Sequence, residues 1–237
     1  MNSTSTDPHF SYDSIADAYA AGIDAAPYNA LYERPAMMAM LPDVHNLNVL
    51  DAGCGAGWYA QHLLMLGARV TAIDESEKLV RHVRARLGDS LDVRVADLSR
   101  PLSFAQDASY DGIVSALTLH YLRDWSTALA EFRRILKPDG WLLFSTHHPA
   151  ADAVRSQPER YLDVEPQEDE WKWAGTVRFF RRPLCEIVNP LADAGFAIER
   201  MVEPAPTEAF RRVKPESYER LLRQPEFLLV MARPWNR

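Results

Sequence analysis

The stretch that decides the fold is LNVLDAGCGAGWYA, residues 47–60. Its apolar residues run into Asp51, and glycines then alternate with other residues over positions 53–57. A helical pattern begins at Trp58, so the stretch predicts a buried strand, a glycine turn and the first turn of a helix. Glycine suits places where the backbone approaches a ligand or takes a positive φ, and the free N–H groups of a helix start favour polar ligand groups. The pattern therefore predicts a nucleotide-like cofactor.

The spacing of the glycines separates the cofactor classes. Dinucleotide sites carry G-x-G-x-x-G, whereas Gly53, Gly55 and Gly57 follow G-x-G-x-G. Trp58 occupies the position of the third dinucleotide glycine, and Asp51 precedes the first glycine by two residues. This D-x-G-x-G-x-G pattern resembles motif I of the class I S-adenosylmethionine-dependent methyltransferases. Taken alone, the loop also fits an ordinary tight turn between a strand and a helix.

Two further apolar runs end in acidic residues. RVTAI, residues 69–73, leads into Asp74, and an acidic residue about 20 positions beyond the loop suits the hydroxyls of a ribose. NAD sites share this feature, so Asp74 does not choose between the cofactors. LDVRVADL, residues 91–98, contains Asp97. In the methyltransferase family an acidic residue there faces the adenine amino group, and a helix N-cap is the alternative reading of Asp97.

Residues 109–145 are predicted to form a strand, a loop, a helix, a turn and a strand. The helix ends at Lys137-Pro138-Asp139-Gly140, and its apolar face consists of Leu129, Phe132, Ile135 and Leu136. This block is similar to the fourth strand, helix and fifth strand of the same family. The ordered motifs over residues 51–145 make the resemblance specific, and they point to a small-molecule, type 11-like methyltransferase domain.

The resemblance implies an α/β fold: a doubly wound, Rossmann-like, seven-stranded sheet whose last strand is antiparallel. It also implies S-adenosyl-L-methionine as the cofactor. The residues that it assigns to the cofactor are Asp51, Gly53, Gly55, Gly57, Asp74, Glu75, Asp97, Leu98, Ser115, Tyr12 and Tyr19.

Residues 1–45 are predicted to form an N-terminal helical cap, and residues 46–237 one methyltransferase domain. Tyr12 and Tyr19 are spaced so that both phenols lie on one face of a helix. One reading is an amphipathic helix that packs both rings on the sheet. The resemblance gives another, a Y-D-x-x-A-x-x-Y helix over the cofactor. Tyr28 extends that wall toward a substrate, and Arg34 either binds the cofactor carboxylate or forms a surface salt bridge.

The predicted fifth strand ends at Thr146-His147-His148-Pro149. In doubly wound folds, ligands lie at the carboxyl ends of the strands. His148 and His120 are therefore candidate catalytic bases, with His147 on the substrate side. The alternative is a strand-end histidine hydrogen-bonded to a loop. No metal is expected, because two histidines without a clustered third ligand are poor grounds for a metal site.

Residues 148–182 are predicted to be an insertion after the fifth strand, acidic in its first half and aromatic in its second. Trp171 and Trp173 are the largest of its apolar residues. They predict a substrate lid over a flat or apolar acceptor. Packing between subunits is the alternative.

Composition excludes several classes of function. The chain has 237 residues and a formal net charge of −7, and this charge argues against a nucleic-acid substrate. No apolar stretch is long enough to cross a membrane, and the two cysteines form no cluster, which indicates a reducing compartment. We expect a cytoplasmic enzyme, monomeric or homodimeric, that methylates an O, N or C nucleophile of a small molecule. The alternatives are a non-catalytic S-adenosylmethionine-binding regulator and a nucleotide-dependent oxidoreductase.

Overall fold

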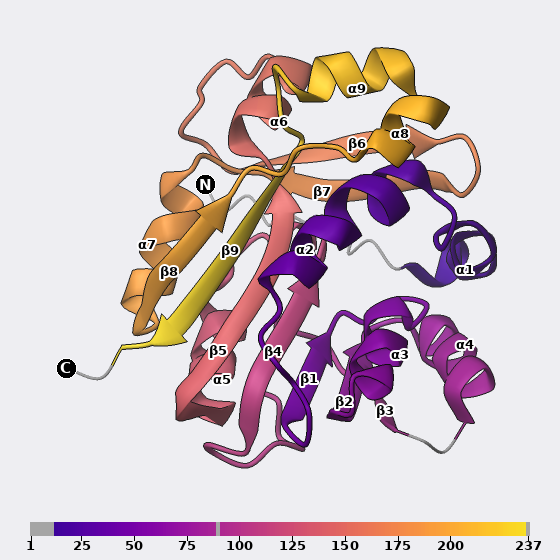
Figure 1. Ribbon diagram of the computed structural model, residues 1–237. Helices are drawn as coiled ribbons and strands as arrows, with labels where there is room; N and C mark the ends of the chain where they lie inside the picture. The colour runs from indigo at the N-terminus through magenta and orange to yellow at the C-terminus, as the bar shows by residue number, and fades with distance from the viewer. Residues whose placement is uncertain (1–11, 89–90, 236–237) are drawn as a thin grey trace.

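The computed structural model describes residues 12–88 and 91–235. At its centre lies a seven-stranded sheet in the order β3-β2-β1-β4-β5-β9-β8 (Figure 1). The strands β1 to β5 are parallel, and β9 is antiparallel to both of its neighbours. This confirms the predicted fold class. The strands of the sheet are β1 (Asn48–Ala52), β2 (Arg69–Asp74), β3 (Asp92–Val95), β4 (Tyr110–Ala116), β5 (Leu136–His147), β8 (Phe196–Val202) and β9 (Phe227–Pro234).

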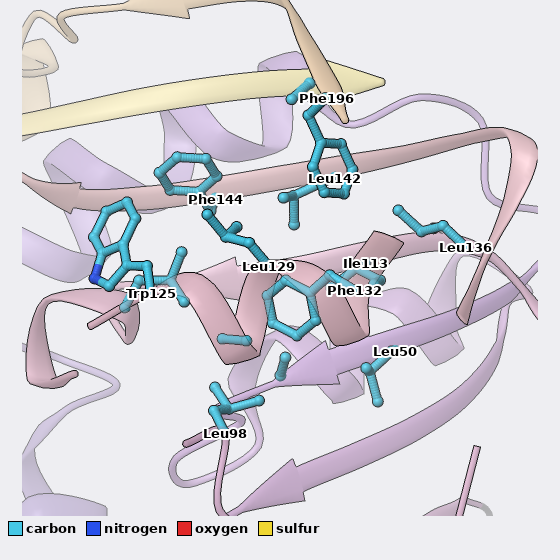
Figure 2. Packing of buried hydrophobic residues seen from close by; sticks show 14 of the residues in the cluster. Leu50, Leu98, Ile113, Trp125, Leu129, Phe132, Leu136, Leu142, Phe144 and Phe196 are labelled. Atoms are coloured by element: carbon cyan, nitrogen blue, oxygen red, sulfur yellow. The ribbon is translucent and has the colours of Figure 1, made fainter. Parts of the chain in front are cut away.

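Helices cover both faces of the sheet, because its central strands are apolar on both sides. Figure 2 shows Leu129 and Phe132 of α5 facing Leu50 and Leu142 of the sheet. Helix α7 packs on the same face. The opposite face packs on α2, α3 and α4. These five helices are α2 (Arg34–Met40), α3 (Trp58–Met65), α4 (Glu77–Leu87), α5 (Ser126–Ile135) and α7 (Cys185–Asp193).

The boundary between α5 and β5 differs from the prediction. The helix ends at Ile135, and Leu136 already pairs with Tyr110 of β4 as a strand residue. The residue before a proline is pushed toward extended backbone, so Lys137 is disfavoured in the helix. Leu136, the C-cap residue, is already extended, with φ −73° and ψ 139°. Leu136 still packs in the core. Hydrophobic periodicity alone therefore misassigned its secondary structure, but not its burial.

The described part of the N-terminal region is helical but is not one continuous helix. It consists of η1 (Tyr12–Ser14), α1 (Ala16–Gly22), the π-helix η2 (Asn29–Glu33) and α2. Despite the break after η1, the rings of Tyr12 and Tyr19 meet edge to face with centroids 5.2 Å apart. Residues 1–11 of the predicted cap lie outside the described residues, and its division from the rest of the chain at residue 45 stays a prediction.

The carboxyl ends of β4 and β5 are covered by two segments of the chain, one after β5 and one between β8 and β9 (Figure 1). Helix α6 (Pro149–Ser156) follows β5, and an antiparallel hairpin of β6 (Glu165–Trp171) and β7 (Gly175–Arg181) completes the predicted insertion. Helices α8 (Glu208–Val213) and α9 (Pro215–Leu221) lie between β8 and β9. Within the described ranges, none of the helices combines the length and apolar character needed to cross a membrane.

Candidate cofactor and acceptor site

The glycine loop after β1 has a backbone that other residues would strain. Gly53, Gly55 and Gly57 have φ values of 79°, 52° and 87°, in the left-handed region that favours glycine. A Cβ on Gly53 would lie 2.2 Å from the Thr118 side chain, and one on Gly57 would lie 3.1 Å from Val83. A Cβ on Gly55 would come within 3.3 Å of the Tyr19 hydroxyl. Gly53 and Gly55 line a pocket, whereas Gly57 packs against α4.

We call this cavity the glycine-loop pocket; its space, including the part open to solvent, is about 650 Å³. It lies at the carboxyl ends of β1, β2 and β4, where ligands bind in doubly wound folds. Its lining residues are Tyr12, Tyr19, Gly53, Gly55, Asp74, Glu75, Leu79, Ala96, Leu98, Ala116, Leu117, Thr118, Tyr121 and Leu122.

Asp74 is a partly buried acid that lines this pocket. Its Oδ2 accepts the N–H of Gly55 and its Oδ1 accepts the N–H of Ser76, each at 2.9 Å. Burial raises the pKa of Asp74 to about 6, and the two backbone hydrogen bonds oppose the rise. A carboxylate oxygen has two lone pairs, so each oxygen keeps one for a ligand hydroxyl. This arrangement suits a ribose.

Four of the predicted cofactor residues lie outside the lining. Gly57 serves packing, and the Ser115 hydroxyl donates to the Ala52 carbonyl at 2.9 Å behind the pocket. Asp97 accepts the N–H of Ser99 at 2.8 Å, an Asx turn rather than a helix N-cap, and its neighbours Ala96 and Leu98 line the pocket instead. Asp51 is buried behind the loop; burial raises its pKa to about 7, and its Oδ2 has no hydrogen-bond partner in the described structure.

A second and larger cavity, the histidine pocket, adjoins the first; its space, including the part open to solvent, is about 1640 Å³. Leu117 and the three tyrosines Tyr12, Tyr19 and Tyr121 line both cavities, so they form the boundary between them. The lining residues of the histidine pocket are Tyr12, Tyr19, Gly22, Ala25, Ala26, Pro27, Tyr28, Asn29, Leu117, His120, Tyr121, His147, Arg155, Asp169, Trp171, Trp173, Lys214, Glu226 and Phe227.

The tyrosines of the boundary are neutral phenols. The hydroxyls of Tyr12 and Tyr121 hydrogen-bond to each other. Burial is the largest cause of a raised pKa in Tyr12, Tyr19 and Tyr121. Tyr121 lies on the 3₁₀ turn η4 (Leu119–Tyr121), directly after β4. Tyr121 and Thr118 were not predicted, although both follow the end of β4, as does the predicted residue His120.

The predicted substrate residues of the insertion line the histidine pocket. Trp171 and Trp173 stand at the tip of the β6–β7 hairpin, with ring centroids 5.5 Å apart. Tyr19 stacks with them at 6.3 and 6.1 Å, and we call these three residues the aromatic wall. Tyr28 also lines the pocket, and its hydroxyl accepts a hydrogen bond from Arg220 at 3.0 Å.

The structure corrects the catalytic assignment of His148. β5 ends at His147, which lines the histidine pocket, whereas His148 is already the N-cap residue of α6 and is absent from the lining. His148 caps α6, because its Nδ1 accepts the N–H of Ala150 at 3.1 Å, and its Nε2 lies 2.7 Å from Glu203. His120 does line the pocket, and its ring stacks on His147 with centroids 4.0 Å apart.

A buried acid behind the site was not predicted. Glu33 accepts hydrogen bonds from Ser145 at 2.6 Å and from Tyr59 at 2.9 Å, and burial raises its pKa to about 7. The next residue, Arg34, is also buried. Its guanidinium lies 4.5 Å from the centre of the Trp58 ring and donates to the Asp24 carbonyl at 3.2 Å. Arg34 lines neither pocket. Its Nη2 lies 3.8 Å from Oδ1 of the half-exposed Asp24, so the predicted salt-bridge alternative is present, with the guanidinium itself buried.

Among the described residues, no group of three or more histidine, cysteine, aspartate and glutamate side chains could hold a metal ion.

The fold and the glycine-loop pocket define an α/β domain that binds a nucleoside-containing cofactor. A family model described as "Methyltransferase domain" matches residues 50–144. The structure is similar to an S-adenosylmethionine-dependent methyltransferase from Mesorhizobium loti, with a TM-score of 0.75 and 34% identity over 90% of this chain and 100% of that one. The chain belongs to the S-adenosylmethionine-dependent methyltransferases, and S-adenosylmethionine is its cofactor.

Curated relatives match over shorter segments. A malonyl-[acyl-carrier protein] O-methyltransferase from Erwinia pyrifoliae is 44% identical over 42% of this chain and 37% of its own length. A ubiquinone biosynthesis O-methyltransferase from Xanthomonas oryzae is 34% identical over 51% of this chain and 52% of its own. The chain thus spans about a third to a half of the length of these two relatives.

Proposed function

We propose that the chain transfers a methyl group from S-adenosylmethionine in the glycine-loop pocket to a small molecule in the histidine pocket. The observation that carries this proposal is the shared boundary: Tyr12, Tyr19, Leu117 and Tyr121 line both cavities. Because the two cavities adjoin at these residues, a donor in one and an acceptor in the other can meet in line there without entering bulk water.

The glycine-loop pocket suits the adenine, the ribose and the sulfonium of the cofactor. Leu98 and Ala96 offer an apolar surface for the adenine, and Asp74 has lone pairs for the ribose hydroxyls. The orphaned Oδ2 of Asp51 adds a buried negative charge behind the loop when that residue is ionised. The aromatic faces of Tyr12 and Tyr19 suit a sulfonium, because aromatic rings attract cations.

The cofactor supplies a methyl group that its sulfonium already makes electrophilic. The residues of this chain bind both reactants, align them and exclude water, contributions that amount to several kcal/mol in enzymes generally. The boundary tyrosines and the aromatic wall are the residues placed to do so. In this proposal residues 148–182, with the β6–β7 hairpin at their centre, act as the substrate lid.

The histidine pocket favours an acceptor with a flat part. The aromatic wall offers stacked indole and phenol faces, while Arg155, Lys214, Asp169 and Glu226 give the remaining lining charges of both signs. The negative net charge of the chain opposes nucleic acid as the acceptor. The two curated relatives are O-methyltransferases by name, which favours an oxygen nucleophile over nitrogen or carbon.

Two measurements test this function in sequence. Calorimetry with S-adenosylhomocysteine and with NAD should give binding of the first and none of the second. Incubation with methyl-labelled S-adenosylmethionine and a panel of phenols, alcohols, amines and carboxylic acids should then give labelled products detected by mass spectrometry. Tight cofactor binding without transfer to any acceptor would instead support the non-catalytic regulator.

A further inference from the structure

Two histidine rings and a buried acid lie together on the acceptor side. His147 ends β5, and its Nδ1 lies 3.6 Å from Oδ1 of Asp152 on α6. The ring of His120 stacks on the ring of His147, with centroids 4.0 Å apart and an interplanar angle of 17°. Asp152 is 4% exposed and His120 is 2% exposed. Phe179 packs edge-on against His147 at 4.4 Å and so fixes the plane of the ring.

The ring nitrogens of the two histidines are not equivalent. The Nδ1 atoms of His120 and His147 are both sealed from solvent and have no hydrogen-bond partner in the described structure. Both rings line the histidine pocket, so Nε2 is the nitrogen that each can present to a bound molecule. The gap of 3.6 Å between His147 Nδ1 and Asp152 is longer than a hydrogen bond. Contacts of this kind are commonly long in the free enzyme and shorten in the reacting complex.

The two rings have different surroundings. Burial holds the pKa of His120 well below its usual range, and the neighbouring His147 and Arg182 lower it further. Two stacked imidazoles repel each other when both are charged. His147 has the carboxylate of Asp152 beside it, and Arg155 on the same helix divides its charge between Asp152 at 3.7 Å and Glu226 at 3.6 Å.

We propose that His147 is the general base of the transfer, that Asp152 is its positioning residue, and that the acceptor therefore carries a hydroxyl or an N–H as its nucleophile. This inference rests on the proposed function. A carboxylate is already ionised at neutral pH and needs no base, so a sealed His–Asp pair beside the nucleophile would serve it no purpose.

For a hydroxyl acceptor, the step transfers one methyl group and one proton. The oxygen lone pair forms the new bond to the methyl carbon, and the electrons of the breaking C–S bond pass to sulfur. The hydroxyl proton moves to Nε2 of His147 while Nδ1–H of the same ring points at Asp152. The products are the methyl ether, S-adenosylhomocysteine and a protonated His147, which returns its proton to water.

The first test reads the tautomer and needs no acceptor. The ¹⁵N spectrum of the imidazoles at alkaline pH should show His147 with its proton on Nδ1 and a free, pyridine-like Nε2. Asp152→Asn retains an acceptor oxygen and should keep this tautomer, whereas Asp152→Leu removes the acceptor and should lose it. A proton on Nε2 of His147 in the unsubstituted protein would overturn the proposal, whatever the variants do.

The second test is kinetic and uses neighbouring histidines as a matched pair. With a phenol acceptor and S-adenosylmethionine, His147→Asn should lower kcat by about 10²–10⁴-fold and leave S-adenosylhomocysteine affinity within threefold. His148→Asn keeps a side-chain oxygen to cap α6 and should stay within threefold in both. Asp152→Asn should lower kcat more than it raises KM. An unaltered kcat in His147→Asn, or faster transfer to the matching carboxylic acid than to the phenol, would contradict the proposal. Failure of transfer to every acceptor would remove the proposed function itself, and the ring spectrum tells that failure apart from failure of the His147–Asp152 pair.

Discussion

The backbone N–H of Gly55 donates to Oδ2 of Asp74 across 2.9 Å, so the glycine loop is tied to the end of β2. The other oxygen of Asp74 accepts the N–H of Ser76 at the start of α4. One partly buried carboxylate thus links the loop after β1, the end of β2 and the start of α4, at the point where the ribose is expected. The same group shapes the loop and offers its remaining lone pairs to the cofactor.

Asp74→Asn should separate the two roles of this residue. The amide oxygen can still accept one of the two backbone N–H groups that Asp74 binds, but the charge that strengthens a ribose contact is lost, at a cost of about 1.5–3 kcal/mol. We expect S-adenosylhomocysteine to bind roughly 10- to 100-fold more weakly by calorimetry at pH 8. Asp97→Asn, outside the pocket lining, is the control and should change affinity less than threefold. Equal losses in both variants would place the ribose elsewhere.

The glycines of the loop should divide between binding and stability. Gly55→Ala places a methyl group beside the Tyr19 hydroxyl in the pocket, so cofactor affinity should fall. Gly57→Ala forces a positive φ on a residue whose Cβ meets Val83, so the free energy of unfolding should fall by about 1–3 kcal/mol with affinity within threefold. Chemical denaturation and calorimetry on both variants check this. Parallel losses of affinity in the two variants would contradict the division.

Glu33 should make stability depend on pH. Its pKa is raised by burial from 4.5 to about 7, so its contribution to stability is complete below pH 4.5 and is lost as pH rises through 7. Glu33→Gln cannot ionise and retains groups that can bond Ser145 and Tyr59. Relative to this variant, the native chain should lose about 3 kcal/mol between pH 4.5 and pH 8, since one pKa unit corresponds to about 1.4 kcal/mol. Urea unfolding at both pH values measures the change, and a difference that is constant with pH would show that Glu33 does not titrate in this window.

The aromatic wall should govern the acceptor and not the cofactor. Trp171 lines the histidine pocket but is absent from the lining of the other one. Trp171→Ala should therefore raise the acceptor KM by about tenfold, since a stacking contact contributes roughly 0.5–1.5 kcal/mol beyond its buried area. Trp235→Ala is a suitable control, because Trp235 is exposed and follows the far end of β9 (Figure 1). Light scattering on the same samples tests subunit packing: dissociation of a dimer with unaltered acceptor kinetics would favour that alternative.

Sequence patterns predicted the sheet well because strands, glycine turns and helix starts are local features. The direction of a side chain at a strand end is harder to predict, because a shift of one residue reverses it. For this reason His148 was selected as catalytic although His147 faces the pocket, and Ser115 was assigned to the cofactor although it faces β1.

Contacts between segments that are distant in the chain could not be predicted from sequence patterns. The hydrogen bond between Tyr12 and Tyr121 joins residues 109 positions apart, and no local pattern pairs them. The burial of Glu33 depends on Ser145 and Tyr59 closing over it. Asp152 was unremarked for the same reason, since it is the packing of α6 against the end of β5 that brings it to His147.

A crystal structure of the complex with S-adenosylhomocysteine tests the central claim most directly, that donor and acceptor occupy adjoining pockets with one shared wall. We predict the adenine beside Leu98, the ribose hydroxyls on Asp74, and the sulfur at the boundary formed by Tyr12, Tyr19 and Tyr121, open toward His147. A sulfur atom pointing away from the histidine pocket, or an adenine lying inside that pocket, would contradict the account.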